Sequence, residues 1–270
     1  MFKAMTALFL VIALSISARA TGSAAEDYRH AMSLLIGNNQ DKSDQDAALE
    51  LLHSTAERGY APGQTAMGAI YEEGVLRVQD IPQAILWYRK AAAQNDWIAQ
   101  FSLGRIYFFG KGVARDASEA KKWFTASSAS GDSGSAFFLG LLNDRDQGAS
   151  PNYSEAAKWY RQSAELGNPF AQEKLAHLLL EGRGVLRNPQ EAYAWLLVAA
   201  ELGNERVQQQ LQSMESDLGS TGAYAARKQA LEIRDSISGH RQNGCSWPEQ
   251  YAEEPTAPSL RAQAACERAN

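Results

Sequence analysis

Apolar residues recur along this chain with the spacing of one helical face, and the pattern returns every 36 residues. One copy spans residues 116–131, where the apolar and small positions fall four, seven, eight, eleven and twelve residues after the first. These positions share one face of a helix, and the other face carries charged residues such as Lys121 and Lys122. The tryptophan of the pattern marks its period, at Trp87, Trp123, Trp159 and Trp195. A strict period of this length predicts stacked helical hairpins.

The period divides the chain from residue 25 to residue 204 into five units. Each unit is predicted to be a helix, a short loop and a second helix. The units are 25–60, 61–96, 97–132, 133–168 and 169–204. A single hairpin cannot cover its own apolar stripe, so we expect the five to stack around a continuous core. Because the tryptophans stand in this stripe, we expect them in the core as well.

The second helix of each unit has a start signal and a stop signal. Residues whose side-chain oxygen can cap a helix start share one column, at Asp44, Asp80, Asp116, Asn152 and Asn188. Residues that tolerate a left-handed turn follow 15 positions later, at Gly59, Asn95, Gly131, Gly167 and Gly203. The two columns predict second helices of about 14 residues.

Three first helices carry a glycine in the middle, at Gly68, Gly104 and Gly140. A glycine inside a helix costs about 1 kcal/mol relative to alanine, so its repetition needs a structural reason. We expect close approach of the paired helix, with the large tryptophan opposite the glycine.

The chain beyond the units divides into a cap and an extension. Residues 205–239 continue the apolar columns, but the stretch Gly219–Gly222 breaks the register, so we predict C-terminal capping helices. Residues 240–270 show little periodicity and contain both cysteines of the chain, Cys245 and Cys266. In an exported protein we expect these two to form a disulfide, which would restrain the tail by about 3 kcal/mol. The alternative is two reduced thiols.

The first twenty residues have the form of an export signal. Lys3 precedes an apolar run from residue 5 to residue 16, and Ala18-Arg19-Ala20 matches a signal-peptidase site. A second possible cut follows Ala25. The apolar run is too short to span a bilayer, which takes about 20 residues, although an uncleaved anchor is the alternative. We therefore predict a periplasmic or secreted protein with no stable membrane span after cleavage.

Composition and motifs narrow the function. The net charge of the 270 residues is −5 and no basic cluster is present, which argues against a nucleic-acid partner. The four histidines have no His-x-x-x-His spacing, so we predict no metal site. Gly110-Lys111-Gly112 lacks the remaining residues of a phosphate loop, so we predict no cofactor.

One catalytic motif occurs by itself. Ser118 and Lys121 form the Ser-x-x-Lys of penicillin-interacting enzymes, but the Ser-Asp-Asn and Lys-Thr-Gly motifs that accompany it are missing. Both residues also stand in the repeat's own helix columns. We therefore predict no catalytic residue.

The units resemble Sel1-like repeats, a relative of the tetratricopeptide repeat. The residues that carry the resemblance in the third unit are Leu103-Gly104-Arg105-Ile106-Tyr107, Gly110-Lys111-Gly112-Val113, Asp116, Ala120, Lys122-Trp123-Phe124 and Gly131. The second unit departs from the pattern, with Leu76 in place of the second loop glycine, so its loop is expected to differ in shape. The resemblance implies an all-α fold, a right-handed superhelical solenoid of stacked αα-hairpins that binds other proteins, often in bacterial envelopes.

The sequence thus predicts an exported scaffold or adaptor that mediates protein–protein interactions in the bacterial cell envelope and is not an enzyme. The expected partner is a protein or peptide bound on the concave face, in a groove formed mainly by the first helices. Two alternatives stay open: a cell-wall or β-lactam-interacting enzyme, and a permanent structural subunit of an envelope assembly. A convergent set of Ser, Lys, Glu or His in one pocket would favour the enzyme.

Overall fold

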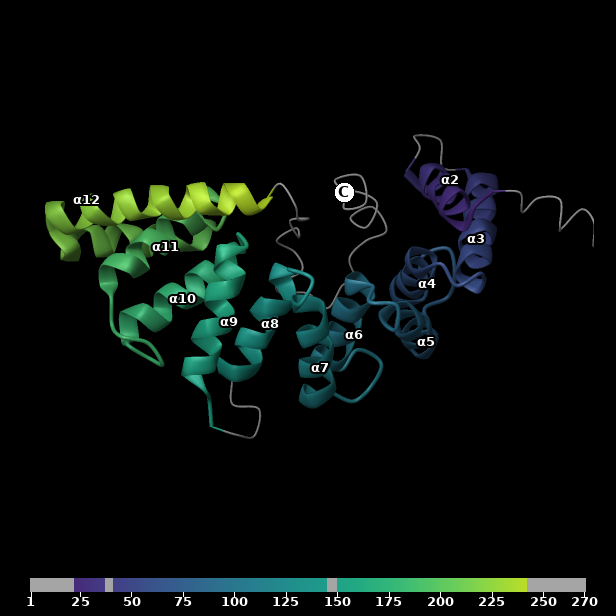
Figure 1. Cartoon of the computed structure of the whole chain (residues 1–270), viewed down its shortest axis with the longest axis horizontal. Coiled ribbons are helices and arrows are strands. Elements are labelled where there is room, and N and C mark those ends of the chain that lie inside the picture. The colour runs from purple at the N-terminus through teal and green to yellow at the C-terminus, as the bar shows by residue number, and fades with distance from the viewer. Residues whose placement is uncertain (1–21, 37–40, 145–149, 242–270) are drawn as a thin grey trace, which may run out of the picture.

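A computed structural model describes residues 22–36, 41–144 and 150–241 of the chain. Within these residues the chain is all-helical, with eleven α-helices and one short 3-10 helix. The helices form an open arch, with α2 and α3 at one end and α12 at the other (Figure 1). Each helix packs against the next one along the chain, from α2 to α12. The predicted solenoid of stacked helical hairpins is therefore confirmed.

Ten of the helices form five antiparallel pairs. In chain order the pairs are α2 (Ala24–Ile36) with α3 (Lys42–Glu57), α4 (Ala61–Glu73) with α5 (Ile81–Ala92), α6 (Trp97–Phe109) with α7 (Ala117–Ser128), α8 (Ser133–Asp144) with α9 (Tyr153–Glu165), and α10 (Pro169–Glu181) with α11 (Pro189–Glu201). First helices of neighbouring pairs also contact each other, α4 with α6 and α6 with α8. Most residues of α4, α6 and α8 are buried as a result.

Four of the five predicted caps start second helices. The side-chain oxygens of Asp80, Asp116, Asn152 and Asn188 each accept a hydrogen bond from the amide three residues further on. In the first repeat the prediction is wrong, because Asp41 caps α3 and Asp44 donates the amide at 2.9 Å. That helix begins one turn earlier than the period indicates.

The predicted left-handed turns close the second helices in all five repeats. Their φ angles run from 64° at Asn95 to 102° at Gly203. The first helices α4, α6 and α10 also end on a left-handed glycine. Leu76 has a φ of 61°, close to the 64° of Gly112 and the 69° of Gly184 in the same column. The loop of the second repeat thus keeps this local conformation although a leucine occupies a position that favours glycine.

The repeated glycines allow close approach of the paired helix, but the tryptophan is not their neighbour. A Cβ at Gly104 would lie 2.6 Å from the ring of Phe124, and one at Gly68 would lie 2.5 Å from the ring of Tyr88. Gly140 has the same relationship with Tyr160, at 2.4 Å. The aromatic residue directly after the tryptophan therefore covers each glycine, because it turns about 100° further around the helix.

The tryptophan column is only partly core. Trp87 and Trp195 are buried, as predicted. Trp123 and Trp159 are half-buried and pack against the edge of the core, so the prediction holds only in part for these two. The indole nitrogen of Trp123 donates a hydrogen bond to the carboxylate of Glu119. The Glu119 side chain is 31% exposed, so this edge of the indole lies near the surface.

The C-terminal cap consists of a 3-10 turn, η1 (Glu205–Val207), and the helix α12 (Gln208–Arg241). Gly219 interrupts α12 with φ 66° and ψ 174°, so two helical segments meet there in a bend. The break of register predicted for Gly219–Gly222 is thus confined to the backbone of Gly219. The segment after Gly219 returns over the last repeats and contacts both α11 and α9 (Figure 1).

Two predictions fall outside the described residues. The export signal, 1–20, precedes the described part of the chain, and the pair Cys245 and Cys266 follows it. Among the helices that are described, none combines the length and the apolar character that crossing a membrane requires.

Candidate functional site

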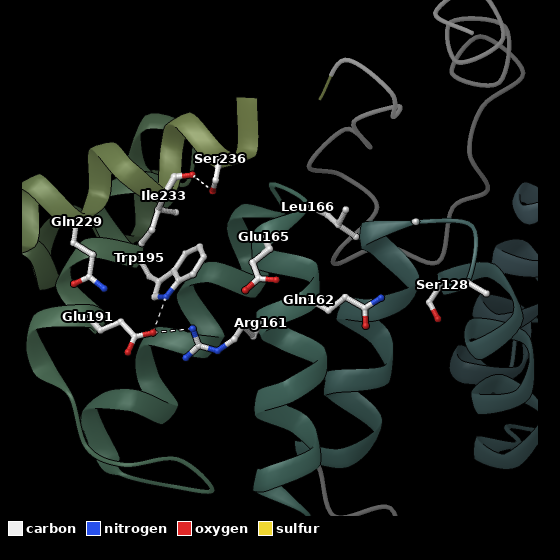
Figure 2. Close-up of a pocket in the computed structure, with 12 residues that line it drawn as sticks. Ser128, Arg161, Gln162, Glu165, Leu166, Glu191, Trp195, Gln229, Ile233 and Ser236 are labelled. Carbon is white, nitrogen blue, oxygen red and sulfur yellow. Dashed lines mark hydrogen bonds and ion pairs between the residues drawn. The ribbon is translucent and has the colours of Figure 1, made fainter. Parts of the chain in front are cut away.

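A groove of about 630 Å³ lies near the C-terminal end of the described chain, between α7, α9, α11 and α12. Its lining comes from the ends of α7 and α9, from α11, and from the part of α12 that follows Gly219 (Figure 2). The lining residues are Ser128, Ala129, Gly131, Arg161, Gln162, Glu165, Leu166, Glu191, Trp195, Gln229, Ile233 and Ser236. A volume of this size is in the range of ligand-binding pockets, about 300–1,000 Å³. We call this feature the C-terminal groove.

An ion pair between two repeats forms one side of the C-terminal groove. Arg161 on α9 and Glu191 on α11 approach to 2.8 Å between Nη1 and Oε1. The same carboxylate oxygen accepts a hydrogen bond from Trp195 Nε1 at 3.4 Å (Figure 2). The guanidinium is 39% exposed and the carboxylate 17%, so the pair can still be reached from the groove. Trp195 itself is 3% exposed and supplies an apolar base together with Ile233.

The charges of the lining leave one negative charge over. The positive charge of Arg161 is compensated by Glu191. The carboxylate of Glu165 is exposed and has no ion pair or side-chain hydrogen bond in the described ranges. In addition, α7 and α9 direct their C-terminal ends into the lining, through Ala129 and Leu166. Helix C-termini carry a partial negative charge from carbonyls without intrahelical partners. The C-terminal groove is therefore a weakly negative environment.

A polar bridge that joins other repeats is missing at the junction of α7 and α8. At three junctions a buried glutamine amide of a first helix donates to a carbonyl near the end of the preceding second helix. These bonds are Gln64 to Ala56 at 3.2 Å, Gln100 to Ala92 at 3.2 Å and Gln172 to Ala164 at 3.1 Å. Between α7 and α8 the glutamine column holds Ala136 and the carbonyl belongs to Ser128. Among the described hydrogen bonds, that carbonyl accepts only from the backbone of Gly131.

A second cluster of charged groups lies buried between the second and third repeats. Tyr88 Oη donates to Glu72 Oε2 at 2.8 Å, and Lys111 Nζ donates to Glu72 Oε1 at 3.0 Å. Arg105 is 1% exposed and also belongs to this region. Burial, followed by the charge of Glu72, raises the pKa of the Tyr88 phenol well above its ordinary value. The cluster is largely buried, with the Lys111 side chain 21% exposed, and it joins the two repeats.

Glu73 stands at the edge of the buried cluster. Burial raises the pKa of its carboxyl to about 7, and the neighbouring charge of Glu72 acts in the same direction. Lys111 and Arg105 oppose the shift through their positive charges. Its Oε1 atom is buried without a hydrogen-bond partner in the described structure. Glu73 is therefore a group that changes its charge near neutral pH.

The isolated sequence motifs have structural explanations. Ser118 and Lys121 are exposed on the first turns of α7, and the Ser118 amide donates to the capping carboxylate of Asp116 at 2.9 Å. Neither residue lines the C-terminal groove. Lys111, from the glycine loop, pairs with Glu72 instead of facing a phosphate site. In the described ranges no group of three or more His, Cys, Asp or Glu residues is placed to hold a metal ion.

The C-terminal groove differs from the binding surface expected from the sequence. No residue of a first helix appears in its lining. Sequence reasoning missed it because one wall comes from the segment after Gly219, which lies outside the repeat register.

The stacked hairpins and this groove define a helical-repeat solenoid, and comparison with known proteins gives its family. The Sel1 repeat model matches residues 27–60, 61–96, 97–132, 133–168 and 169–204. The chain therefore belongs to the Sel1 repeat family. Proteins of this family generally mediate protein–protein interactions and are generally not enzymes.

Two solved structures are similar over most of the chain. A Sel1 repeat protein from Oxalobacter formigenes is 27% identical, with a TM-score of 0.68 over 82% of this chain and 89% of that one. The second is c5321, a protective antigen present in uropathogenic Escherichia coli strains that displays an SLR fold. It is 26% identical, with a TM-score of 0.71 over 94% of this chain and 54% of the antigen. The chain thus spans about half of the antigen's length. No curated protein matches the chain.

Proposed function

We propose that this protein is an exported adaptor that mediates protein–protein interactions in the bacterial cell envelope. One observation carries the proposal: an open groove of ligand-binding size lies between helices of three repeats and the cap. The family's general role in protein interactions supports it. Repeat solenoids commonly bind their partners along extended surfaces that several repeats form together.

Export is supported by the sequence of the first twenty residues. The start of α2 favours the first of the two possible cuts. Ser23 Oγ accepts from the Glu26 amide at 3.2 Å, and Glu26 Oε2 accepts from the Ser23 amide at 2.8 Å. This reciprocal pair is a capping box, which satisfies two backbone amides at the start of α2. A cut after Ala20 keeps the capping box in the mature protein. The oxidising compartment that export implies would also favour a bond between Cys245 and Cys266.

The chemistry of the C-terminal groove supports binding and not turnover. Its polar residues are one ion-paired arginine, two glutamates, two glutamines and two serines. The carboxylate of Glu191 is occupied by Arg161 and Trp195, and no histidine, cysteine or lysine lies in the lining. A nucleophile with an adjacent base, which most hydrolytic sites require, is therefore not assembled there.

The test is crosslinking in the native envelope with the exported full-length protein, followed by identification of the captured proteins. The adaptor function predicts a reproducible partner in the envelope fraction and no hydrolytic turnover by the purified protein. Reproducible turnover of a cell-wall or β-lactam substrate that disappears in Ser118→Ala would establish the enzyme alternative instead. A partner that never dissociates during purification would indicate a permanent structural subunit.

A further inference from the structure

We infer that the C-terminal groove binds an extended segment of the partner protein and places a lysine or arginine side chain of that segment beside Glu165. The inference rests on the proposed adaptor function and adds the chemistry of the ligand to it. Three features of the lining support it: the uncompensated carboxylate, the two helix ends and the apolar base.

The side-chain charges of the lining favour a cation. The lining contains one positive group, Arg161, and two negative groups, Glu165 and Glu191. The 2.8 Å contact between Arg161 and Glu191 neutralises one charge of each sign. Glu165 is left as an exposed carboxylate on the last turn of α9, where it lines the groove (Figure 2). A basic side chain would complete this ion pair.

The backbone of the lining favours the same kind of ligand. The C-terminal ends of α7 and α9 meet at the C-terminal groove, and each contributes acceptor groups and a partial negative charge. This partial negative charge attracts an ammonium or a guanidinium group, whose three or five donors can also bond to the Glu165 carboxylate.

The apolar part of the lining suits the rest of a basic side chain. Trp195, Leu166 and Ile233 line the groove beside the polar residues. Lysine and arginine bury their aliphatic stems on apolar surface while the charged end stays near water or a counter-ion. The exposed amides of Gln162 and the half-buried Gln229 are available for the backbone of an extended segment. An acidic segment would meet Glu165 and two helix C-termini, which would repel it.

The experiment is site-specific photo-crosslinking of the full-length protein in its native cells. A photo-reactive amino acid is placed at Gln162 in the groove and, in a separate strain, at Glu50 on the exposed face of α3. The crosslinked segment of the partner is then identified by mass spectrometry. We expect capture from Gln162, and a lysine or arginine within a few residues of the crosslinked position.

Charge variants test the role of Glu165. Capture from Gln162 should fall about tenfold or more in Glu165→Lys and by a smaller factor in Glu165→Gln, because the first repels a cation and the second only removes the attraction. The matched control is Glu201→Lys, an exposed glutamate on α11 outside the lining, which should leave capture unchanged. Circular dichroism of each purified variant checks that the repeats stay folded.

Several outcomes would overturn the inference. They are a captured segment without a basic residue, a captured second copy of this chain, and capture that Glu165→Lys does not change. Capture from Glu50 without capture from Gln162 would reject the groove and leave the adaptor function standing. If neither Gln162, nor Glu50, nor further positions around the arch capture a protein, the adaptor function is rejected as well.

Discussion

Tyr88 and Glu72 form a hydrogen bond of 2.8 Å between two side chains that are both completely buried. The bond joins the two helices of the second repeat, and Lys111 from the third repeat contacts the same carboxylate. In the fourth repeat Tyr160 and Asp144 form the same pair at 3.0 Å. The third repeat has Phe124 and Phe108 in these columns. Polar pairs and aromatic pairs thus occupy equivalent places in successive repeats.

Removal of the Tyr88 hydroxyl should destabilise the protein by about 1–3 kcal/mol, because Tyr88→Phe leaves a buried carboxylate without one of its donors. Urea denaturation followed by circular dichroism measures the loss. Tyr224→Phe is the matched control, since Tyr224 is 72% exposed and should show no change. Equal stability of Tyr88→Phe and the parent protein would show that the buried bond contributes nothing.

Glu73 should make the stability depend on pH. Its pKa rises from 4.5 to about 7 on folding, so the folded state holds the proton more tightly than the unfolded state. The contribution of protonated Glu73 to the free energy of unfolding is therefore complete below pH 4.5 and is lost as the pH rises through 7. Glu73→Gln should remove this loss and be more stable than the parent at pH 8 by about 1–2 kcal/mol, less than the full shift because solvent screens the partly exposed group.

The control for this measurement is Glu57→Gln, at an exposed position at the end of α3. Denaturation between pH 4.5 and pH 8 should give the same profile for this variant and the parent. A Glu73→Gln profile parallel to that of the parent would contradict the assigned shift.

Gly104 and Phe124 should be coupled. Gly104→Ala should cost about 1–3 kcal/mol, although alanine favours helices, because the added Cβ would lie 2.6 Å from the phenylalanine ring. Phe124→Leu should restore part of that stability, as the fifth repeat combines Ala176 with Leu196 in the same two columns. A double-mutant cycle should give a coupling of about 1 kcal/mol or more. Strict additivity would reject the coupling.

The glutamine bridges should stabilise the junctions between repeats. Gln100→Ala removes the 3.2 Å bond to the Ala92 carbonyl and should cost about 1–2 kcal/mol, because the site is buried. Gln83→Ala, at an exposed position on α5, is the control with the same change of side chain. Hydrogen exchange should show the greatest loss of protection at the junction of α5 and α6, and a uniform loss would argue against a local bridge.

The mature protein should begin at Thr21. Cleavage after Ala20 keeps both hydrogen bonds of the Ser23–Glu26 capping box, whereas cleavage after Ala25 removes Ser23 and opens α2 at its first turn. N-terminal sequencing of the protein from the envelope fraction decides between the two sites. A chain that begins at Glu26, or one that retains Met1, would contradict the prediction.

Most of the fold could be predicted from the repeat pattern, because the same columns of residues occur in five units. Caps at Asp80, Asp116, Asn152 and Asn188 follow from local hydrogen bonding and were predictable. The first cap was not, because Asp41 and Asp44 are both good capping residues and the period favoured the wrong one. The neighbour of the glycines was missed because adjacent residues of one helix, such as Trp123 and Phe124, share the broad apolar stripe.

The candidate site depended on information that no repeat contains. Arg161 and Glu191 stand 30 residues apart, and their 2.8 Å contact follows only from the stacking of α9 beside α11. Ile233 and Ser236 reach the groove because the chain bends at Gly219, and the direction of that bend is set by packing against α11. Long-range placement of this kind is absent from local patterns of polarity.

The bend at Gly219 makes one helix serve both as the terminator of the stack and as a wall of the C-terminal groove. Every lining residue lies between Ser128 and Ser236, so the first two repeats contribute none. Duplication or loss of a unit near the N-terminus would therefore change the span of the arch and leave the groove intact. A unit added between α11 and α12 would separate Glu191 from Ile233 and destroy it. Variation in repeat number among descendants of this gene can thus be tolerated at one end of the molecule and not at the other.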